Sequence, residues 1–591
     1  MNRARKKRYK RGMLKRLAQE SFVLSATRRL SSRFVRFFES GFASPLLASY
    51  KKVDEFAREK ISDPIEKRIG IRKNFAMPTR NAIASFIARS PIMKTFNQLR
   101  TSFLNTSMRS VGVFLLTFGI YAAAIFALKS YVSVTLGTPA SINDISFSAV
   151  TALIGIILML FGDKTILNTL GNGRIVGQLL LKCLGVNDSS VDKYASATPI
   201  TTAGVSFLLG SIFGISTLFY TPASVMFFIA VLLVCIAILH IPEFGILLSA
   251  AIFSFVSIYT VAFVVSVTFI SFLIKCIRLK RNFGFGTADA VVLMLFAVTC
   301  VACVTTQGNV THRELYVICF TSVYFLAKNL LCSEKLVYQT LNALCVGLTA
   351  GMALYILGDF ATLIPHDELR NGPFWLTKQT LDGSMLAMAA SVLLPFALSS
   401  LTSADKRRPK RMFLVFAIVC AVLVDSPLFY VMLFASVFVF AATMYKAPVG
   451  ATLGAVLVIP PVAVLASDYT ASSAFGFGVK TVYDTESMSL VQEKFANFWS
   501  GIYRFGGVVA VCLFVIAMLL ILQRIFGTIR DNAETKGSHI GGTVAASTII
   551  ALCCSFIFNP FDDLRMLMVM WFVIGFGSAI SKIVSFSKYS E

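Results

Sequence analysis

Long apolar runs recur along the chain from Val111 to Ser585 and dominate its hydrophobic pattern. Most runs have the roughly 17–25 residues that an α-helix needs to cross a hydrocarbon core about 30 Å thick, and a few are shorter. A transmembrane β-barrel would instead show alternating segments of about 10 residues. The pattern therefore predicts an all-α polytopic integral membrane protein with about 12–16 transmembrane helices. The predicted spans are 111–128, 146–162, 203–219, 222–239, 243–257, 259–275, 287–304, 315–331, 336–357, 384–402, 411–424, 427–445, 449–466, 505–524, 543–559 and 565–585.

The amino-acid composition supports this class of protein. Of the 591 residues, 56% are hydrophobic and 14% are charged, and the mean hydropathy is +0.74. A soluble globular domain has about 45–50% apolar residues and about 25% charged residues. The excess of apolar residues excludes an ordinary soluble enzyme.

The first part of the chain, residues 1–110, is strongly basic. It holds 26 Lys/Arg and 7 Asp/Glu, a net charge of +19 out of +25 for the whole chain. Aromatic residues such as Phe22, Phe34 and Phe37 are mixed with these charges, which favours amphipathic helices on an anionic inner leaflet. Two alternatives are a charged cytoplasmic tail and, with no recognition motif to support it, nucleic-acid binding. The predicted division is a basic arm, 1–110, and a transmembrane domain, 111–585.

Three clusters of Lys and Arg test the topology, at 275–281, 405–411 and 524–536. Loops on the cytoplasmic side of a membrane carry an excess of these residues. With the predicted spans, all three clusters fall on one side when both termini are cytoplasmic. We therefore expect a multi-pass protein with both termini in the cytoplasm.

Two of the loops predicted to face outward are long, 358–383 and 467–504. They contain Trp375 and Trp499, two of the three tryptophans. Tryptophan is enriched at membrane–water interfaces, so both are expected to act as interfacial anchors.

The outward segments also carry the candidate chemistry. His366, Asp367 and Arg370 lie in the first loop, Arg504 ends the second, and Arg565 opens the last span. An Arg guanidinium can bind pyrophosphate through two parallel hydrogen bonds, and a His or a carboxylate can accept a proton from a hydroxyl. The alternative is that these charges only mark helix ends at the interface.

Ionisable residues within the predicted spans are rare, and Asp425 and Glu243, next to helix ends, are the exceptions considered. This rarity disfavours a proton-driven transporter with a buried carboxylate relay. No nucleotide-binding loop, serine-hydrolase elbow or zinc-protease motif is present, which disfavours the corresponding enzymes.

Three segments resemble a known family. Ile241-Pro242-Glu243-Phe244-Gly245, the stretch from Leu381 to Pro395, and the stretch from Arg565 to Trp571 are similar to segments of the O-antigen ligase and polymerase superfamily, in particular to diverged clostridial-type members. The resemblance implies a membrane glycosyltransferase of cell-envelope polysaccharide biosynthesis. Its substrate would be an undecaprenyl-pyrophosphate-linked glycan at the outer face of a bacterial cytoplasmic membrane, with no metal or cofactor.

On this resemblance, the catalytic residues are His366, Arg370 and Arg504, and the substrate-binding residues are Arg565 and Asp367. Arg370 and Arg504 would hold the pyrophosphate group while His366 acts as the base.

The chain departs from the family pattern at two positions. Pro427 and Phe495 stand where an Arg and a His of the family are expected. Two alternatives therefore stay open: a catalytically degenerate member that binds lipid-linked glycan, and a membrane transporter or flippase.

Overall fold

The computed structural model falls into two compact units. Of the residues described, unit 1 comprises Ser249–Ser266 and those from 283 onward, and unit 2 comprises those from 106 to 248 together with 267–277. The structure describes residues 106–132, 142–160, 203–277, 283–307, 312–331, 334–362, 380–402, 435–440, 443, 481–484, 489–492, 497–531 and 536–590. Most of the predicted basic arm and most of both predicted outward loops lie outside these residues.

The prediction of an all-α membrane fold is confirmed. A helix occupies each predicted span outside 411–466, a stretch of which little is described. The helices are α6 (Met108–Val132), α7 (Ile142–Leu160), α11 (Ala203–Ser216), α12 (Pro222–His240), α13 (Pro242–Ile252), α14 (Ile258–Ile277), α15 (Thr287–Gln307), α16 (His312–Leu330), α17 (Glu334–Thr362), α19 (Gly383–Thr402), α23 (Phe498–Asp531), α24 (Lys536–Ile557) and α25 (Leu564–Ser590).

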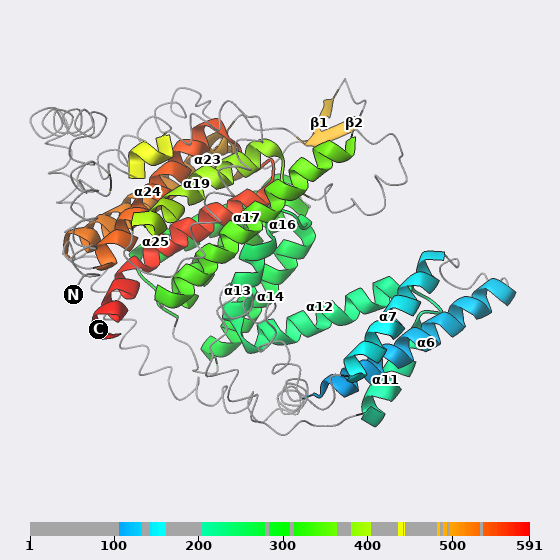
Figure 1. Ribbon diagram of the computed structural model, residues 1–591. Coiled ribbons are helices and arrows are strands. Elements are labelled where there is room, and N and C mark those ends of the chain that lie inside the picture. Colours follow the sequence, from blue (N-terminus) through cyan, green and yellow to red (C-terminus); the bar gives the residue numbers. More distant parts are fainter. Residues whose placement is uncertain are drawn as a thin grey trace, which may run out of the picture. The chain divides into compact units, whose positions relative to one another are not determined.

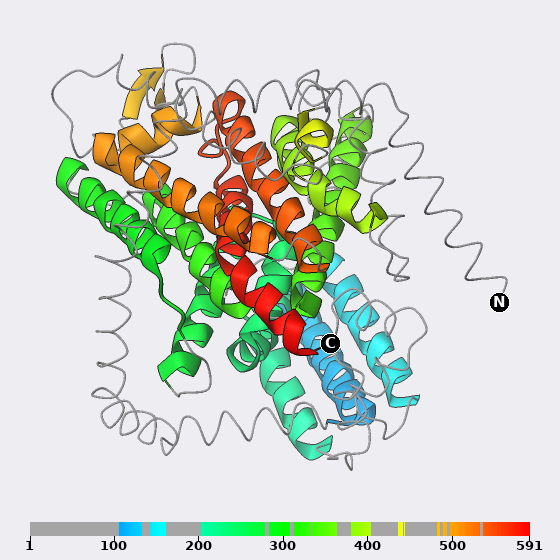
Figure 2. The same ribbon diagram turned by 90° about the vertical axis from the view of Figure 1, so that its left-hand side faces the viewer.

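Two short strands, which the hydrophobic pattern did not predict, form an antiparallel hairpin in unit 1. Strand β1 (Thr481–Asp484) pairs with β2 (Ser489–Gln492), with Thr481 opposite Gln492. The hairpin precedes α23 in the chain, and Figure 2 shows its two strands in gold. It falls within the predicted outward loop 467–504.

Five of the described helices are long and apolar enough to cross a membrane: Met108–Tyr131, Pro222–Leu239, Ile258–Ile277, Gln339–Gly358 and Phe498–Ile529. Among the described residues, the other apolar helices contain shorter apolar stretches of 10–17 residues. The number of 12–16 spans stays a prediction.

Unit 2 is held together by close contacts at glycines. Helix α6 packs along both α7 and α11 (Figure 1). A Cβ atom at Gly119 would lie 2.7 Å from the carbonyl oxygen of Ser148, and one at Gly112 would lie 2.7 Å from that of Gly155. Because lipid is as apolar as the helices, close packing of small residues is what joins helices within a bilayer.

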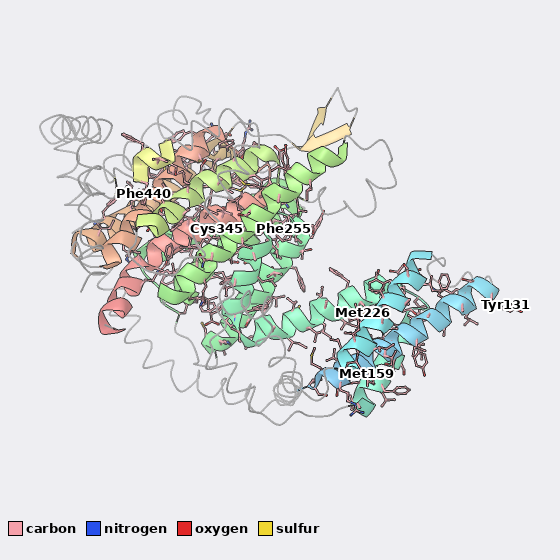
Figure 3. All side chains as sticks on the ribbon, viewed as in Figure 1. Tyr131, Met159, Met226, Phe255, Cys345 and Phe440 are labelled. Carbon is pink, nitrogen blue, oxygen red and sulfur yellow. The ribbon has the colours of Figure 1, made fainter. Side chains whose placement is uncertain are left out.

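The exposed surface of the unit 2 helices is apolar. Leu153 of α7 is 59% exposed, and Leu208 and Ile212 of α11 are each 61% exposed. Met226 of α12 lies against a small core formed by Phe118, Ala122 and Val225 (Figure 3). Large apolar faces of this kind are unusual on soluble proteins and indicate contact with lipid.

The core of unit 1 is built around α24 and α25. Every residue from Leu564 to Ile580 is buried, and so is nearly every residue from Gly541 to Phe556. Helix α25 packs against α16, α23 and α24, and α24 also packs against α19 (Figure 1). A helix that is apolar all round is stable only when other helices or lipid surround it. Here other helices surround it.

Helix α23 begins earlier than predicted. The side-chain oxygen of Asn497 accepts a hydrogen bond from the Ser500 backbone N–H at 2.9 Å, and Ser500 Oγ accepts one from the Asn497 N–H at 3.2 Å. This reciprocal pair is a capping box, which starts a helix at Phe498.

The predicted role of Trp499 as an anchor in a loop is therefore wrong. Trp499 lies in α23 and is 2% exposed. Its Nε1 donates to Ser555 Oγ at 3.0 Å, and its ring packs edge-on against Phe514 at 5.5 Å.

Candidate functional site

The beginnings of α23 and α25 meet at one end of the unit 1 bundle. The ring of Phe505 stacks on Phe561 with centroids 5.0 Å apart, and that of Phe498 stacks on the same ring at 5.6 Å. Phe505 follows Arg504 directly, and Phe561 lies four residues before Arg565. The stacking therefore brings the segments that carry these two predicted site residues together.

Arg565 is held by its own helix start. Asp563 Oδ1 accepts from the Arg565 backbone N–H at 3.0 Å and from its Nε at 2.9 Å, while Asp563 Oδ2 accepts from Nη2 at 2.5 Å. Arg565 Nη1 also donates to the carbonyl oxygen of Val256 at 2.9 Å, and the residue is 7% exposed. The guanidinium is thus paired with a carboxylate, and its clearest function is to fix the start of α25 against the segment containing Val256.

The turn before α25 is equally well fixed. Asn559 Oδ1 accepts from the Phe561 N–H at 3.1 Å, and Asn559 Nδ2 donates to Asp562 Oδ1 at 2.9 Å. Asn side chains stabilise turns by such local bonds. The turn sets Phe561 in place for the stacking described above.

Of the other predicted site residues, only Arg504 is described. It lies in the second turn of α23 and is partly exposed. His366, Asp367 and Arg370 lie outside the described residues.

An apolar cavity of about 30 Å³, here called the aromatic crevice, lies at the same end of the bundle. Its two polar residues, Thr299 and Thr321, donate their hydroxyls to the carbonyl oxygens of Leu295 and Val317, each at 2.8 Å. Since both hydroxyl protons are committed to their own helices, the wall is apolar in effect. The crevice is lined by Leu295, Phe296, Thr299, Val317, Ile318, Thr321, Phe498, Ile502, Phe505, Phe561, Leu567 and Trp571.

Elsewhere in unit 1 the structure shows a buried polar group, here called the Asp289 cluster, which consists of Asp289, Tyr324, Lys328 and Ser578. Lys328 Nζ forms an ion pair with Asp289 Oδ2. The Tyr324 hydroxyl lies 2.7 Å from Asp289 Oδ1 and 3.1 Å from Ser578 Oγ. Asp289 is 0% exposed and Lys328 2%, so the ion pair is shielded from solvent.

Local structure explains how Asp289 comes to be there. Its Oδ2 accepts from the Gly286 N–H at 2.5 Å, as the third residue of a helix does in a capping box. Lys328 lies in the last turn of α16, and the neighbouring Asn329 accepts from the Gly284 N–H at 2.8 Å. The cluster thus ties the start of α15 to the end of α16 and, through Ser578, to α25.

The hydrophobic pattern did not predict this cluster. Asp289 and Lys328 both lie within predicted spans, so the inference that charged residues are scarce there overlooked them. Glu243, one of the exceptions that were considered, lies in the first turn of α13, where a carboxylate favours the helix. Asp425 lies outside the described residues. One signal for the ion pair was available in the sequence. An acidic residue lies in the first turn of one predicted span, and a Lys lies in the last turn of the next.

These features define an all-α membrane protein with an apolar crevice at one end of a bundle and a buried ion pair within it. No protein-family model, curated protein or solved structure matches the chain. The resemblance to O-antigen ligases and polymerases therefore stays a prediction.

Proposed function

We propose that the protein is a membrane glycosyltransferase that acts on a lipid-linked glycan where α23 and α25 begin. One observation carries the proposal. Phe505 lines an apolar crevice, and the residue directly before it in the chain, Arg504, is cationic. A lipid pyrophosphate combines the same two properties, a negatively charged group and a hydrocarbon chain. The resemblance to lipid-linked glycan ligases points to the same kind of substrate.

In this proposal, Arg504 stabilises the charge of the departing lipid pyrophosphate. Preorganised donors that face developing charge are a large source of catalysis, and a planar guanidinium matches phosphate oxygens. His366 removes the proton from the attacking hydroxyl. Arg370 shares the pyrophosphate, and Asp367 binds substrate. Arg565, already paired with Asp563, acts by holding the site in shape.

Replacing Arg504 with Ala is expected to lower glycan transfer by about a hundredfold, as loss of one charge-stabilising donor does in other enzymes. Arg504→Lys is expected to restore only part of the activity, because an ammonium group cannot bind two phosphate oxygens in a fork. The measurement is transfer of labelled glycan from an undecaprenyl-pyrophosphate donor in membrane vesicles. The control is Arg530→Ala, near the other end of the same helix, which should transfer normally. Normal transfer by Arg504→Ala would contradict the proposal.

The Asp289 cluster favours a second candidate, a transporter or flippase, because buried charges within membrane bundles commonly mark transport paths. The same vesicle experiment separates the two. A transporter moves the lipid-linked glycan across the bilayer without forming a new glycosidic bond. A catalytically degenerate relative would bind the donor and do neither.

We further propose that the chain resides in a bacterial cytoplasmic membrane with both termini cytoplasmic, and that the arm 1–110 binds the anionic leaflet. Each basic residue near such a surface contributes about 1 kcal/mol, and salt screens the attraction. A fragment of residues 1–110 should therefore bind anionic vesicles and dissociate as salt rises. A fragment with the basic residues of 3–11 changed to Gln should bind more weakly. Equal binding to neutral vesicles would rule out the electrostatic attachment.

A further inference from the structure

Helix α23 is interrupted near its beginning. Gly507 has φ 68° and ψ −165°, a backbone conformation that is not helical and is essentially restricted to glycine. The helix therefore consists of a short piece, residues 498–506, and a long piece that begins after Gly507. We call the short piece the gate segment.

The gate segment forms one wall of the aromatic crevice. Phe498, Ile502 and Phe505 line the cavity from this piece, at a spacing that places them on one helix face. The remaining walls come from α15, α16 and α25 and the turn that precedes α25. A movement of the gate segment about Gly507 would thus change the size of the crevice.

The contacts that hold the gate segment against its neighbours are mainly aromatic. The rings of Phe498 and Phe505 stack on Phe561, and such contacts do not have the directional constraint of an ion pair. Trp499 Nε1 adds a hydrogen bond to Ser555 Oγ. Gly501 lies directly against the ring of Phe561, because a Cβ at this position would be 2.3 Å from a ring carbon.

The lining of the crevice defines what can occupy it. Both threonine hydroxyls donate to their own helices, so a sugar or an ordered water would find few partners, and a hydrocarbon would lose nothing. The flanking residues Met294 and Leu315 are 58% and 50% exposed on α15 and α16. Exposed apolar residues of this kind are suited to contact with lipid beside the crevice.

We propose that the gate segment turns about Gly506–Gly507 and admits one hydrocarbon chain of a bilayer lipid to the aromatic crevice. The closed cavity of about 30 Å³ is too small for such a chain, so entry requires this movement. The inference rests on the proposed function in one respect: the chain admitted during transfer is that of the lipid carrier. It does not require Arg504 or any catalytic step.

A disulfide across the gate tests the proposal. Cysteines at Gly501 and Phe561 would have β-carbons close to the separation of about 3.5–4.5 Å that a disulfide needs. The double variant Gly501→Cys/Phe561→Cys is placed in vesicles with phosphatidylglycerol that carries a photoactivatable diazirine in its acyl chain. Oxidation should lower labelling of the peptide containing Trp571 at least tenfold, and reduction should restore it. Each single variant, treated alike, controls for the native cysteines.

Several results would contradict the proposed movement of the gate segment. Equal labelling of the oxidised and reduced double variant, absence of crevice labelling in the reduced form, or failure of the disulfide to form would each do so. As a second variant, Gly507→Ala disfavours the closed backbone and should raise early labelling several-fold, while Gly527→Ala, with open space around it, should not. Unchanged labelling in Gly507→Ala would also contradict the gate. Arg504→Ala should leave labelling intact, so failure of the transferase proposal and failure of the gate give different results.

Discussion

Replacing Lys328 with Met is expected to lower the free energy of unfolding by about 3–5 kcal/mol. The change leaves the carboxylate of Asp289, which is 0% exposed, without its cation. Tyr324 and the Gly286 N–H still donate to Asp289, but neither carries a positive charge. The guanidinium of Arg524 lies nearby, on the other side of Gly286, without the direct contact that Lys328 makes. The measurement is denaturant unfolding in detergent micelles, followed by the fluorescence of the tryptophans.

The double variant Asp289→Asn/Lys328→Met should recover most of that loss. A buried ion pair and a neutral replacement commonly have similar stability, whereas a single unpaired charge does not. Arg109→Met is the matched control, since Arg109 is exposed on α6 and should change stability by no more than about 0.5 kcal/mol. If Lys328→Met unfolds like the unmodified protein, the ion pair does not hold these helices together.

The second large effect is expected at Gly575, where α25 meets α16. A Cβ atom here would lie 2.6 Å from the carbonyl oxygen of Tyr324 and 3.0 Å from Ala327 Cβ. Because a backbone oxygen cannot move aside as a side chain can, Gly575→Val must separate the two helices. Overpacking of this kind destabilises by about 1–3 kcal/mol, and here it would also stretch the hydrogen bonds of Tyr324.

Gly527→Ala is the control for this substitution. Gly527 lies in α23, where a Cβ atom would meet nothing within 4 Å, and Ala is favoured over Gly in a helix by about 1 kcal/mol. The control should therefore unfold at the same or a slightly higher denaturant concentration. A Gly575→Val variant as stable as this control would show that the two helices can separate without loss.

The hydrophobic pattern predicted the helices well because the requirement to cross a membrane acts on each helix separately. The predicted span 287–304 corresponds to α15, Thr287–Gln307, and the predicted span 384–402 corresponds to α19, Gly383–Thr402. The beginning of α23 was missed because it depends on a local polar capping box, Asn497 with Ser500, which lies before the apolar run.

The site was less predictable, since its contacts join residues far apart in the chain. Asp289 pairs with Lys328 and, through Tyr324, reaches Ser578 on α25. Phe505 of α23 stacks on Phe561 in the turn before α25. The aromatic stacking has no signature in the sequence, and the ion pair has only the two charges at helix ends, because both contacts depend on how apolar helices that look alike in sequence pack together. Arg565 was recognised as special, but its carboxylate partner two residues earlier was not.

The burial of α25 also has a consequence for biosynthesis. Helices α15, α16, α19 and α23 all precede α25 in the chain, yet α25 or its neighbour α24 supplies packing surface to α16, α19 and α23. During synthesis those earlier helices enter the bilayer while this surface is still missing. We expect lipid tails to cover these inner faces until α24 and then Leu564–Ser590 are inserted. During that interval the Tyr324 hydroxyl lacks Ser578 as a partner. A chain halted before α25 would therefore expose unfinished packing surface to membrane quality control.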